Sequence, residues 1–420
     1  MCGKALEGSI MPLRRSDEAV NLVCLFLMSI VMGPFISTFF SLNIYDDTVH
    51  GFVEAGFEKV FDSFRQNFGE GLERDGAAVA VYYRSKLVVD IWGGYADREA
   101  SVIWKRNTRT VLFSITKAIS SLCIAVLVDN GLIRYEDRLV DFWPEYGAFG
   151  KENTTVEDVL THKAGLPYLE EDIEMRDVTD FIRIQKKIER SKPVWKPDKK
   201  GRDLKTFFLE EIARPNDLAI GIGVDPEERW KVARITTPTL WEFFRDSIRN
   251  PKLIVMLAIM YARFDDIIWK IKANTKWLLI NYDTMSVNDP EVLALPLPAL
   301  TGVASASDLS RLFSLAIDGS LLSNRTLKTI SSPTLDNWHL EKVTLWPIRK
   351  GHGFFYEKNP LVPGAFTFGH PGYGGQFVHV DPANQMVLTY VSNGLKTGTG
   401  EVCTTYMRLL QSTYNALKAQ

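Results

Sequence analysis

Residues 113–132 read FSITKAISSLCIAVLVDNGL, and this stretch determines which fold and which chemistry the chain can support. Its apolar run predicts a helix that ends at Asn130 and Gly131. Ser114 and Lys117 stand three residues apart where that helix starts, so their side chains share one face and the amine reaches the hydroxyl. A serine hydroxyl becomes a good nucleophile when a neighbouring base takes its proton, and a desolvated lysine can be that base. The pair therefore indicates acyl transfer, although about one or two Ser-x-x-Lys sequences would occur by chance in a chain of this length.

A second candidate feature lies near the C-terminal end, where residues 368–376 read FGHPGYGGQ. Glycines this dense at the start of a strand let the backbone approach a ligand closely and aim an amide N–H at it. The hypothesis is an oxyanion hole made by the backbone N–H groups of Ser114 and Tyr373, with His370 beside the substrate. The expected substrate-binding positions are Gly372 and Gly374. The alternative is a glycine-rich hairpin whose histidine is satisfied by its neighbours.

The composition limits the classes of function. With 420 residues, of which 46% are hydrophobic and 24% charged, the chain can bury the core of one large α/β domain or of two smaller ones. A net charge of -2 gives no global electrostatic reason to bind nucleic acid, so no nucleic-acid partner is expected. The 4 cysteines form no Cys-x-x-Cys and the 6 histidines no His-x-x-x-His, so neither a metal nor another cofactor is expected. Cys123 and Cys403 are either two buried thiols or a disulfide pair, and the sequence leaves this open.

Strand patterns lie at both ends of the chain, with helical patterns between them. Two β-rich runs, residues 77–83 and 86–94, flank the short polar turn Arg84-Ser85. Further β-rich runs cover residues 351–356, 365–369, 375–381 and 386–393, before a final helix over 402–418. This order predicts an α/β (α+β) fold, in which an antiparallel sheet is flanked by helices and carries a helical lobe.

Taken together and in order, these landmarks resemble the serine β-lactamase-related family. That family includes class C β-lactamases, class VIII esterases, penicillin-binding-protein-like peptidases and animal β-lactamase domain-containing proteins. The resemblance runs from about residue 57 to residue 416, through FSITK at 113–117, DNGL at 129–132, FWPE at 142–145, TVEDVLTHKAGL at 155–166, GHPG at 369–372 and DP at 381–382. It implies a serine β-lactamase/transpeptidase-like fold with Ser114 as the acylated nucleophile and Lys117 as its base. His370, Pro371 and Gly372 stand where other members carry Lys-Thr-Gly.

The function that this resemblance implies is that of a serine hydrolase, which forms an acyl-enzyme on Ser114 and acts on an ester, amide or peptide substrate. One departure bears on it. The family's second motif, a tyrosine that helps to protonate the leaving group, has no counterpart here, because VWKP at 194–197 runs directly into DKKGRDLKTFF at 198–208. Tyr168 is the nearest unassigned tyrosine. The alternative function is therefore a catalytically impaired pseudoenzyme or shortened variant that serves as a binding or assembly module.

The N-terminal segment predicts a membrane anchor. Residues 22–42 hold no charged side chain over 21 positions, which matches the ~20 residues that a helix needs to cross a bilayer. Lys4, Arg14 and Arg15 precede this run, while residues 43–58 contain no lysine or arginine. The positive-inside rule then places the N-terminus in the cytosol.

The expected domain organisation is a cytosolic segment at residues 1–20, a transmembrane helix at 21–43 and a β-lactamase-related domain at 48–418. The expected localisation is that of a single-pass membrane protein, with secretion after signal cleavage or a mitochondrial address as the alternatives. A small-molecule or peptide acyl substrate and the lipid bilayer around residues 22–42 are the expected partners. The oligomeric state stays open.

Overall fold

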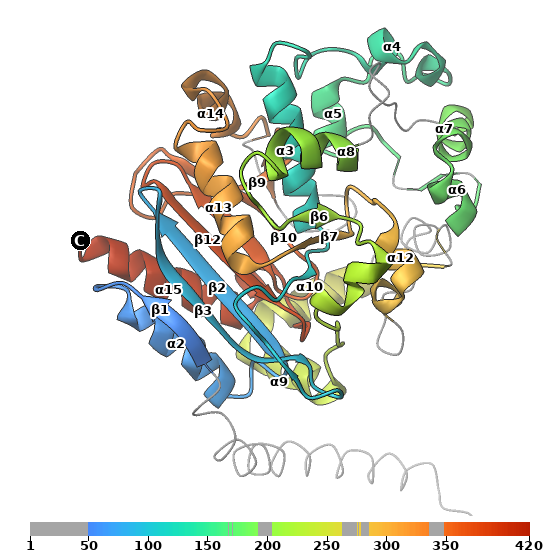
Figure 1. Ribbon diagram of the computed structural model, residues 1–420. Coiled ribbons are helices and arrows are strands. Elements are labelled where there is room, and N and C mark those ends of the chain that lie inside the picture. Colours follow the sequence, from blue (N-terminus) through green and yellow to red (C-terminus); the bar gives the residue numbers. More distant parts are fainter. Residues whose placement is uncertain are drawn as a thin grey trace, which may run out of the picture.

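The computed structural model describes residues 49–166, 168, 169, 171–191, 204–262, 275, 277, 278, 285–335 and 348–420. The predicted α/β architecture is confirmed, because a central antiparallel sheet of 9 strands has the order β1-β3-β2-β12-β11-β10-β9-β8, with β4 paired to β3 (Figure 1). The strands are β1 Val49–Val53, β2 Gly76–Tyr83, β3 Lys86–Asp97, β4 Val102–Ile103, β8 Arg349–Gly351, β9 Phe354–Lys358, β10 Phe366–Pro371, β11 Phe377–Asp381 and β12 Met386–Ser392. Strands from the two ends of the chain therefore meet at the β2–β12 pair.

The hairpin between β2 and β3 has the turn that the sequence predicts. Tyr83 pairs with Lys86, which leaves Arg84 and Ser85 as a two-residue connection. Both have positive φ, 51° and 62°. A turn with two left-handed residues matches the right-handed twist of the strands that it joins, so this short polar sequence closes the hairpin tightly.

Helices cover both faces of the sheet. Helices α2 Glu58–Gly69 and α15 Thr404–Lys418 lie side by side on one face, while α3 Ile115–Asp129 and α13 Ala306–Ile317 pack on the other (Figure 1). Successive residues of β2 alternate between the two layers: Val79 belongs to the α2/α15 core, and Ala80 to the α3/α13 core. The small Ala80 lets α13 approach closely enough for Ser310 Oγ to donate to the Ala80 carbonyl at 3.3 Å. Cys123 and Cys403 are free, buried thiols in different cores.

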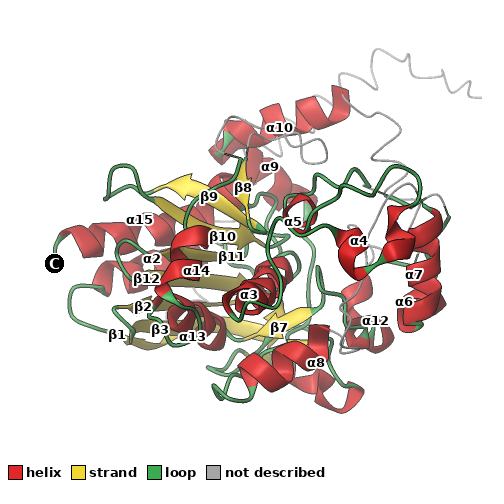
Figure 2. Ribbon diagram, turned by 90° about the horizontal axis from the view of Figure 1, so that it is seen from above, coloured by secondary structure: helices red, strands yellow, loops and turns green. Residues whose placement is uncertain are grey.

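The central part of the chain forms the predicted helical lobe and a second, small sheet. The small sheet has the strand order β5-β7-β6, from β5 Thr110–Val111, β6 Gly221–Ile222 and β7 Gly302–Ala304. The remaining α-helices of the described residues are α4 Leu139–Phe142, α5 Val156–Leu160, α6 Met175–Thr179, α7 Phe181–Arg190, α8 Leu204–Phe208, α9 Leu240–Arg249, α10 Pro251–Ala262, α12 Pro290–Ala294 and α14 Asn324–Ile330. In both views α4, α6 and α7 gather at the end of the molecule away from β1 and α15 (Figures 1 and 2).

The expectation of a transmembrane helix requires a correction. Among the described residues, no helix combines the length and the apolar composition that crossing a bilayer requires. Helices α3 and α15, at 15 residues each, reach about 22 Å at 1.5 Å per residue, less than the ~30 Å hydrocarbon layer. The prediction of an N-terminal membrane helix, and of a single-pass membrane protein, is therefore not supported; residues 22–42, on which it was based, lie outside the described residues.

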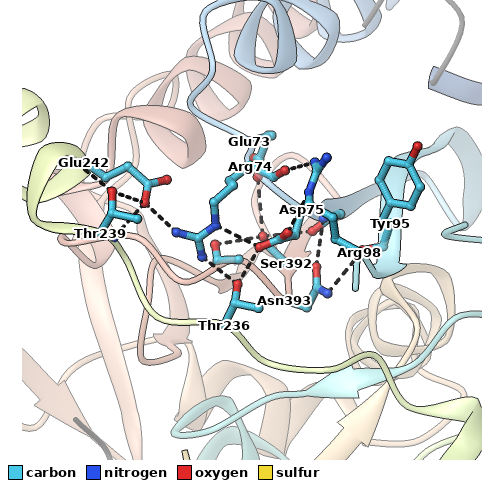
Figure 3. A network of polar contacts seen from close by, with 12 residues as sticks. Glu73, Arg74, Asp75, Tyr95, Arg98, Thr236, Thr239, Glu242, Ser392 and Asn393 are labelled. Atoms are coloured by element: carbon cyan, nitrogen blue, oxygen red, sulfur yellow. Dashed lines mark hydrogen bonds and ion pairs between the residues drawn. The ribbon is translucent and has the colours of Figure 1, made fainter. Parts of the chain in front are cut away.

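A buried polar network joins the loop before β2 to the end of β12 (Figure 3). Glu73, which is fully buried, accepts a hydrogen bond from Tyr390 Oη and pairs with Lys396 Nζ at 2.8 Å. Asn393 Oδ1 accepts from the Gly76 amide at 2.8 Å, and its Nδ2 donates to the Ala96 carbonyl at 3.0 Å. Buried polar groups that are satisfied in this way hold one backbone arrangement, so the chain leaves β12 in a fixed direction.

A buried histidine ties α15 to the sheet. His379 of β11 is 2% exposed, and its Nε2 lies 2.9 Å from Tyr414 Oη while its Nδ1 lies 3.2 Å from Tyr406 Oη. Tyr414 Oη donates to Asp381 Oδ2 at 2.9 Å, so it accepts from His379 Nε2–H and leaves Nδ1 as the acceptor for Tyr406. Both ring nitrogens are thus satisfied in the neutral form. Burial lowers the pKa of His379 to about 4.

We predict that acid destabilises the fold through this histidine. An unfolded histidine binds a proton near pH 6.5, while His379 in the folded state does so only at about pH 4. Between these values the unfolded state binds more protons, so the free energy of unfolding decreases as the pH falls from about 6.5 to about 4. Urea unfolding at several pH values should show a shallower decrease for His379→Gln than for the wild type. His50→Gln, which removes an exposed histidine of β1, is the control; equal slopes in all three proteins would contradict the prediction.

Candidate active site

The backbone turns sharply just before the candidate nucleophile. Phe113 is fully buried and has a φ of 48°, a left-handed conformation that costs a non-glycine residue about 1–3 kcal/mol and persists only where the surrounding structure enforces it. The Leu112 amide donates to the Gly302 carbonyl of β7 at 2.8 Å, and the Ile115 amide donates back to Leu112 at 3.1 Å. This turn carries the chain from β5 into α3 and places Ser114 at the helix N-terminus.

The predicted serine–lysine pair is assembled. Lys117 Nζ lies 2.9 Å from Ser114 Oγ and 3.2 Å from the Ala299 carbonyl, to which it donates hydrogen bonds. Both residues are half-buried. Burial, and secondarily the positive charge of Lys350, lowers the pKa of Lys117 to about 8. An amine with this pKa is partly deprotonated near neutral pH. Only the deprotonated amine can accept the proton of the serine hydroxyl.

The glycine-rich turn lies against the start of α3. The Gly372 amide donates to the Gln376 carbonyl at 2.7 Å, which closes the turn. Gln376, fully buried, donates from Nε2 to the Val111 carbonyl of β5 at 2.9 Å, and the Tyr373 ring meets the Phe113 ring edge-on at 5.7 Å. The two distant candidate motifs therefore share one site. No motif in the sequence pointed to Gln376 as the contact that joins them.

His370 faces the same site from β10. It is 4% exposed, and its ring stacks on Phe355 with centroids 4.5 Å apart. Its Nδ1 lies 2.8 Å from the Pro371 carbonyl, which can only accept, so Nδ1 carries the proton and Nε2 holds the lone pair. Burial, followed by the charge of Lys117, lowers the pKa of His370 well below its ordinary value. The imidazole is therefore neutral at physiological pH.

Two further basic residues, not selected from the sequence as site residues, lie close by. Lys350 of β8 is 2% exposed, and its Nζ lies 3.0 Å from His162 Nδ1 and 5.3 Å from the centre of the Phe355 ring. His162 follows α5 with a φ of 61°, so a non-glycine residue again occupies the left-handed region. Lys350 belongs to no sequence motif, and it reaches the candidate site only because β8 packs against segments far away in the chain.

The second motif of the resembling family has no counterpart among the contacts of this site. In the part of the chain that the structure describes, Lys117 donates to Ser114 and Ala299, and neither Lys117 nor Ser114 hydrogen-bonds to a tyrosine oxygen. Tyr168 is half-buried in a bend, and residues 194–197 lie outside the described residues. Within the described ranges, no three His, Cys, Asp or Glu side chains lie close enough to hold a metal ion.

The chain is similar to known proteins in sequence and in fold. The sequence model of the family described as Beta-lactamase matches residues 64–202 and 199–412. The esterase/β-lactamase LipL of Mycobacterium tuberculosis is 28% identical over 377 residues, covering 83% of each chain. A penicillin-binding protein homologue from Caulobacter crescentus is 27% identical with a TM-score of 0.71, covering 88% of this chain and 99% of that one. A family VIII carboxylesterase shares the fold with a TM-score of 0.74 at 24% identity, with the same coverage.

We predict that the glycine turn tolerates no side chain at Gly374. Gly374 has a φ of 79°, and an added Cβ would lie 2.4 Å from Leu395 Cδ2 and 2.7 Å from Leu395 Cβ. Gly364 has a similar φ of 82° with nothing within 4 Å of an added Cβ, so Gly364→Ala isolates the backbone strain of about 1–2 kcal/mol. Denaturant unfolding should show a larger loss of stability for Gly374→Ala than for Gly364→Ala. Equal losses would mean that Leu395 does not confine the turn.

Proposed function

The chain belongs to the β-lactamase family, and on that premise we propose that it is a serine hydrolase of esters or amides that forms a covalent acyl-enzyme on Ser114. The observation that carries this proposal is the 2.9 Å hydrogen bond between Lys117 Nζ and Ser114 Oγ, made by an amine whose pKa is lowered to about 8. At pH 7 roughly one tenth of such amines are neutral, which is enough to act as a base.

In the proposed reaction, neutral Lys117 takes the proton of Ser114 Oγ as the oxygen attacks the substrate carbonyl. The negative charge on the carbonyl oxygen is stabilised by the backbone N–H groups of Ser114 and Tyr373. The C–O or C–N bond to the leaving group then breaks, and the Lys117 ammonium returns the proton to that group. Water attacks the acyl-enzyme through the same base and restores Ser114. Gly372 and Gly374 line the substrate site beside His370, whose bare Nε2 is a hydrogen-bond acceptor.

Ester substrates fit this site best. LipL is named as an esterase/β-lactamase, and the family VIII protein as a carboxylesterase. An alkoxide or phenolate leaves more readily than an amide nitrogen, which must be protonated before it departs. A site without the family's tyrosine has one proton donor fewer. Hydrolysis of an ester depends less on such a donor than hydrolysis of an amide does. The partner proposed from this chemistry is a small-molecule or peptide acyl compound.

The missing tyrosine favours a second candidate function, a catalytically impaired protein that serves as a binding or assembly module. A lost general acid lowers a rate by typically 10²–10⁴-fold. In this alternative the site binds an acyl compound without turning it over. Acylation of Ser114 is the step that separates the two functions.

We predict that a fluorophosphonate probe labels the wild type but not Ser114→Ala. Lys117→Met should lower the labelling rate by about 10²–10⁴-fold, because the base is lost. The wild-type rate should rise with pH through about 8, as Lys117 loses its proton. Ser120→Ala is the matched control, because Ser120 lies on the same helix and donates to the Thr116 and Pro298 carbonyls rather than facing Lys117.

The outcomes distinguish the candidates. Labelling that stays equal in Ser114→Ala would overturn Ser114 as the nucleophile. An unlabelled wild type that still binds the ester would favour the binding module. If the probe labels Ser114 but p-nitrophenyl acetate is not turned over, the loss of activity lies in a step after acylation. In the later steps the leaving group needs a proton donor and the attacking water needs a proton acceptor.

A further inference from the structure

We propose that Lys350, held by His162 and by the Phe355 ring, is a positioning residue for Lys117, because its fixed positive charge disfavours a second positive charge on the neighbouring amine. This inference rests on the proposed function, in which Lys117 must be neutral to act. It assigns a task to a buried cation that the reaction itself does not use.

The position of Lys350 is fixed by the backbone on both sides. It is the middle residue of β8, where its backbone pairs with Phe355 of β9. Its carbonyl accepts from the Leu335 amide at 2.8 Å and from the Thr334 amide at 3.1 Å. The residue is 2% exposed, so the ammonium is held in a site that shields little of its charge.

His162 and Phe355 hold the ammonium. A lysine ammonium can only donate, so at 3.0 Å His162 Nδ1 accepts and the proton of a neutral imidazole lies on Nε2. The Phe355 ring, 5.3 Å from Nζ, offers its negative face to the charge. The same ring stacks on His370 at 4.5 Å, so ammonium, phenyl and imidazole form a connected row that ends at the site.

The hairpin that carries Lys350 packs directly on α3. Ser121 Oγ donates both to the Lys117 carbonyl at 2.7 Å and to the Gly353 carbonyl at 3.2 Å. A Cβ on Gly353 would lie 2.0 Å from Ser121 Oγ, so the β8–β9 turn and the helix are in close contact. The β8–β9 hairpin that carries Lys350 is therefore packed against the helix that carries Lys117.

Among the described residues, the charged and titratable groups that interact with one another here are Lys117 of α3, His370 of β10, Lys350 of β8 and His162 after α5. His370 is neutral, because burial and the charge of Lys117 lower its pKa. The nearby carboxylate of Glu157 in α5 accepts from the His352 amide at 3.1 Å. Lys350 is the group whose charge acts on Lys117, and it lowers the pKa of that amine in the same direction as burial does.

The experiment measures the ionisation of Lys117 directly, in a Ser114→Ala background, so it does not depend on acylation of Ser114. Trace acetylation with acetic anhydride across pH 6–11, read by peptide mass spectrometry, gives the midpoint at which Lys117 becomes reactive. Lys350→Met should raise this midpoint by roughly half a pH unit or more, which lowers the reactivity of Lys117 at pH 7 about threefold or more. Lys350→Arg keeps the charge and should keep the midpoint.

Two further variants make the result specific. Lys358→Met removes an exposed cation from the same hairpin and should leave the midpoint unchanged. His162→Gly removes the imidazole at a position whose φ of 61° suits glycine, so it releases the ammonium without new backbone strain and should raise the midpoint. Circular dichroism checks the fold of each variant, and Lys350→Gln replaces Lys350→Met if the latter does not fold.

An unchanged midpoint in a folded Lys350→Met or Lys350→Gln would overturn the inference. Equal upward shifts in the Met and Arg variants would also overturn it, because they would mean that packing rather than charge matters. A raised midpoint in a protein whose Ser114 does not react with fluorophosphonate would support the role of Lys350 and count against the proposed hydrolase. The experiment thus distinguishes a failure of the inference about Lys350 from a failure of the proposed hydrolase function.

Discussion

The hydrogen bond from Gln376 Nε2 to the Val111 carbonyl is the contact on which the candidate site depends, because it joins two pieces of chain 265 residues apart. On one side of it lie β5, the strained Phe113 and Ser114. On the other lies the turn closed by the Gly372 amide. If the turn moved relative to the strand, the two backbone amides proposed for the oxyanion would no longer point at one atom.

The support for this contact extends to the loop before β2, one of the central strands of the sheet. Gly374 accepts from the Lys396 amide at 2.9 Å, and Lys396 Nζ pairs with the buried Glu73 at 2.8 Å. The segment that follows β12 is therefore anchored both to the glycine-rich turn and to the polar network in the loop before β2. A buried ion pair contributes little net stability on average, yet removal of one partner leaves an uncompensated charge. We interpret this pair as a device that sets the direction of the chain toward the site.

Local sequence patterns predicted most of the fold and the position of the serine–lysine pair. The turn at Arg84 and Ser85, the strands on both sides of it, and the helix that starts at Ser114 follow from neighbouring residues alone. Gln376 and Lys350 were not predictable in this way, because a buried glutamine and a buried lysine acquire their partners from segments far away in the chain. The expected membrane helix came from apolar composition alone, and no described helix supports it.

The pairing of β2 with β12 has a consequence for how the protein is made. The Gly76 carbonyl accepts from Ser392 Oγ across 316 residues, so the centre of the sheet is incomplete until nearly the whole chain has left the ribosome. At about 5–20 residues per second, the first hairpin waits roughly 15–60 seconds with an exposed edge. An unpaired edge of this kind invites pairing with other chains, so we expect chaperones to shield the nascent chain until its last strand is synthesised.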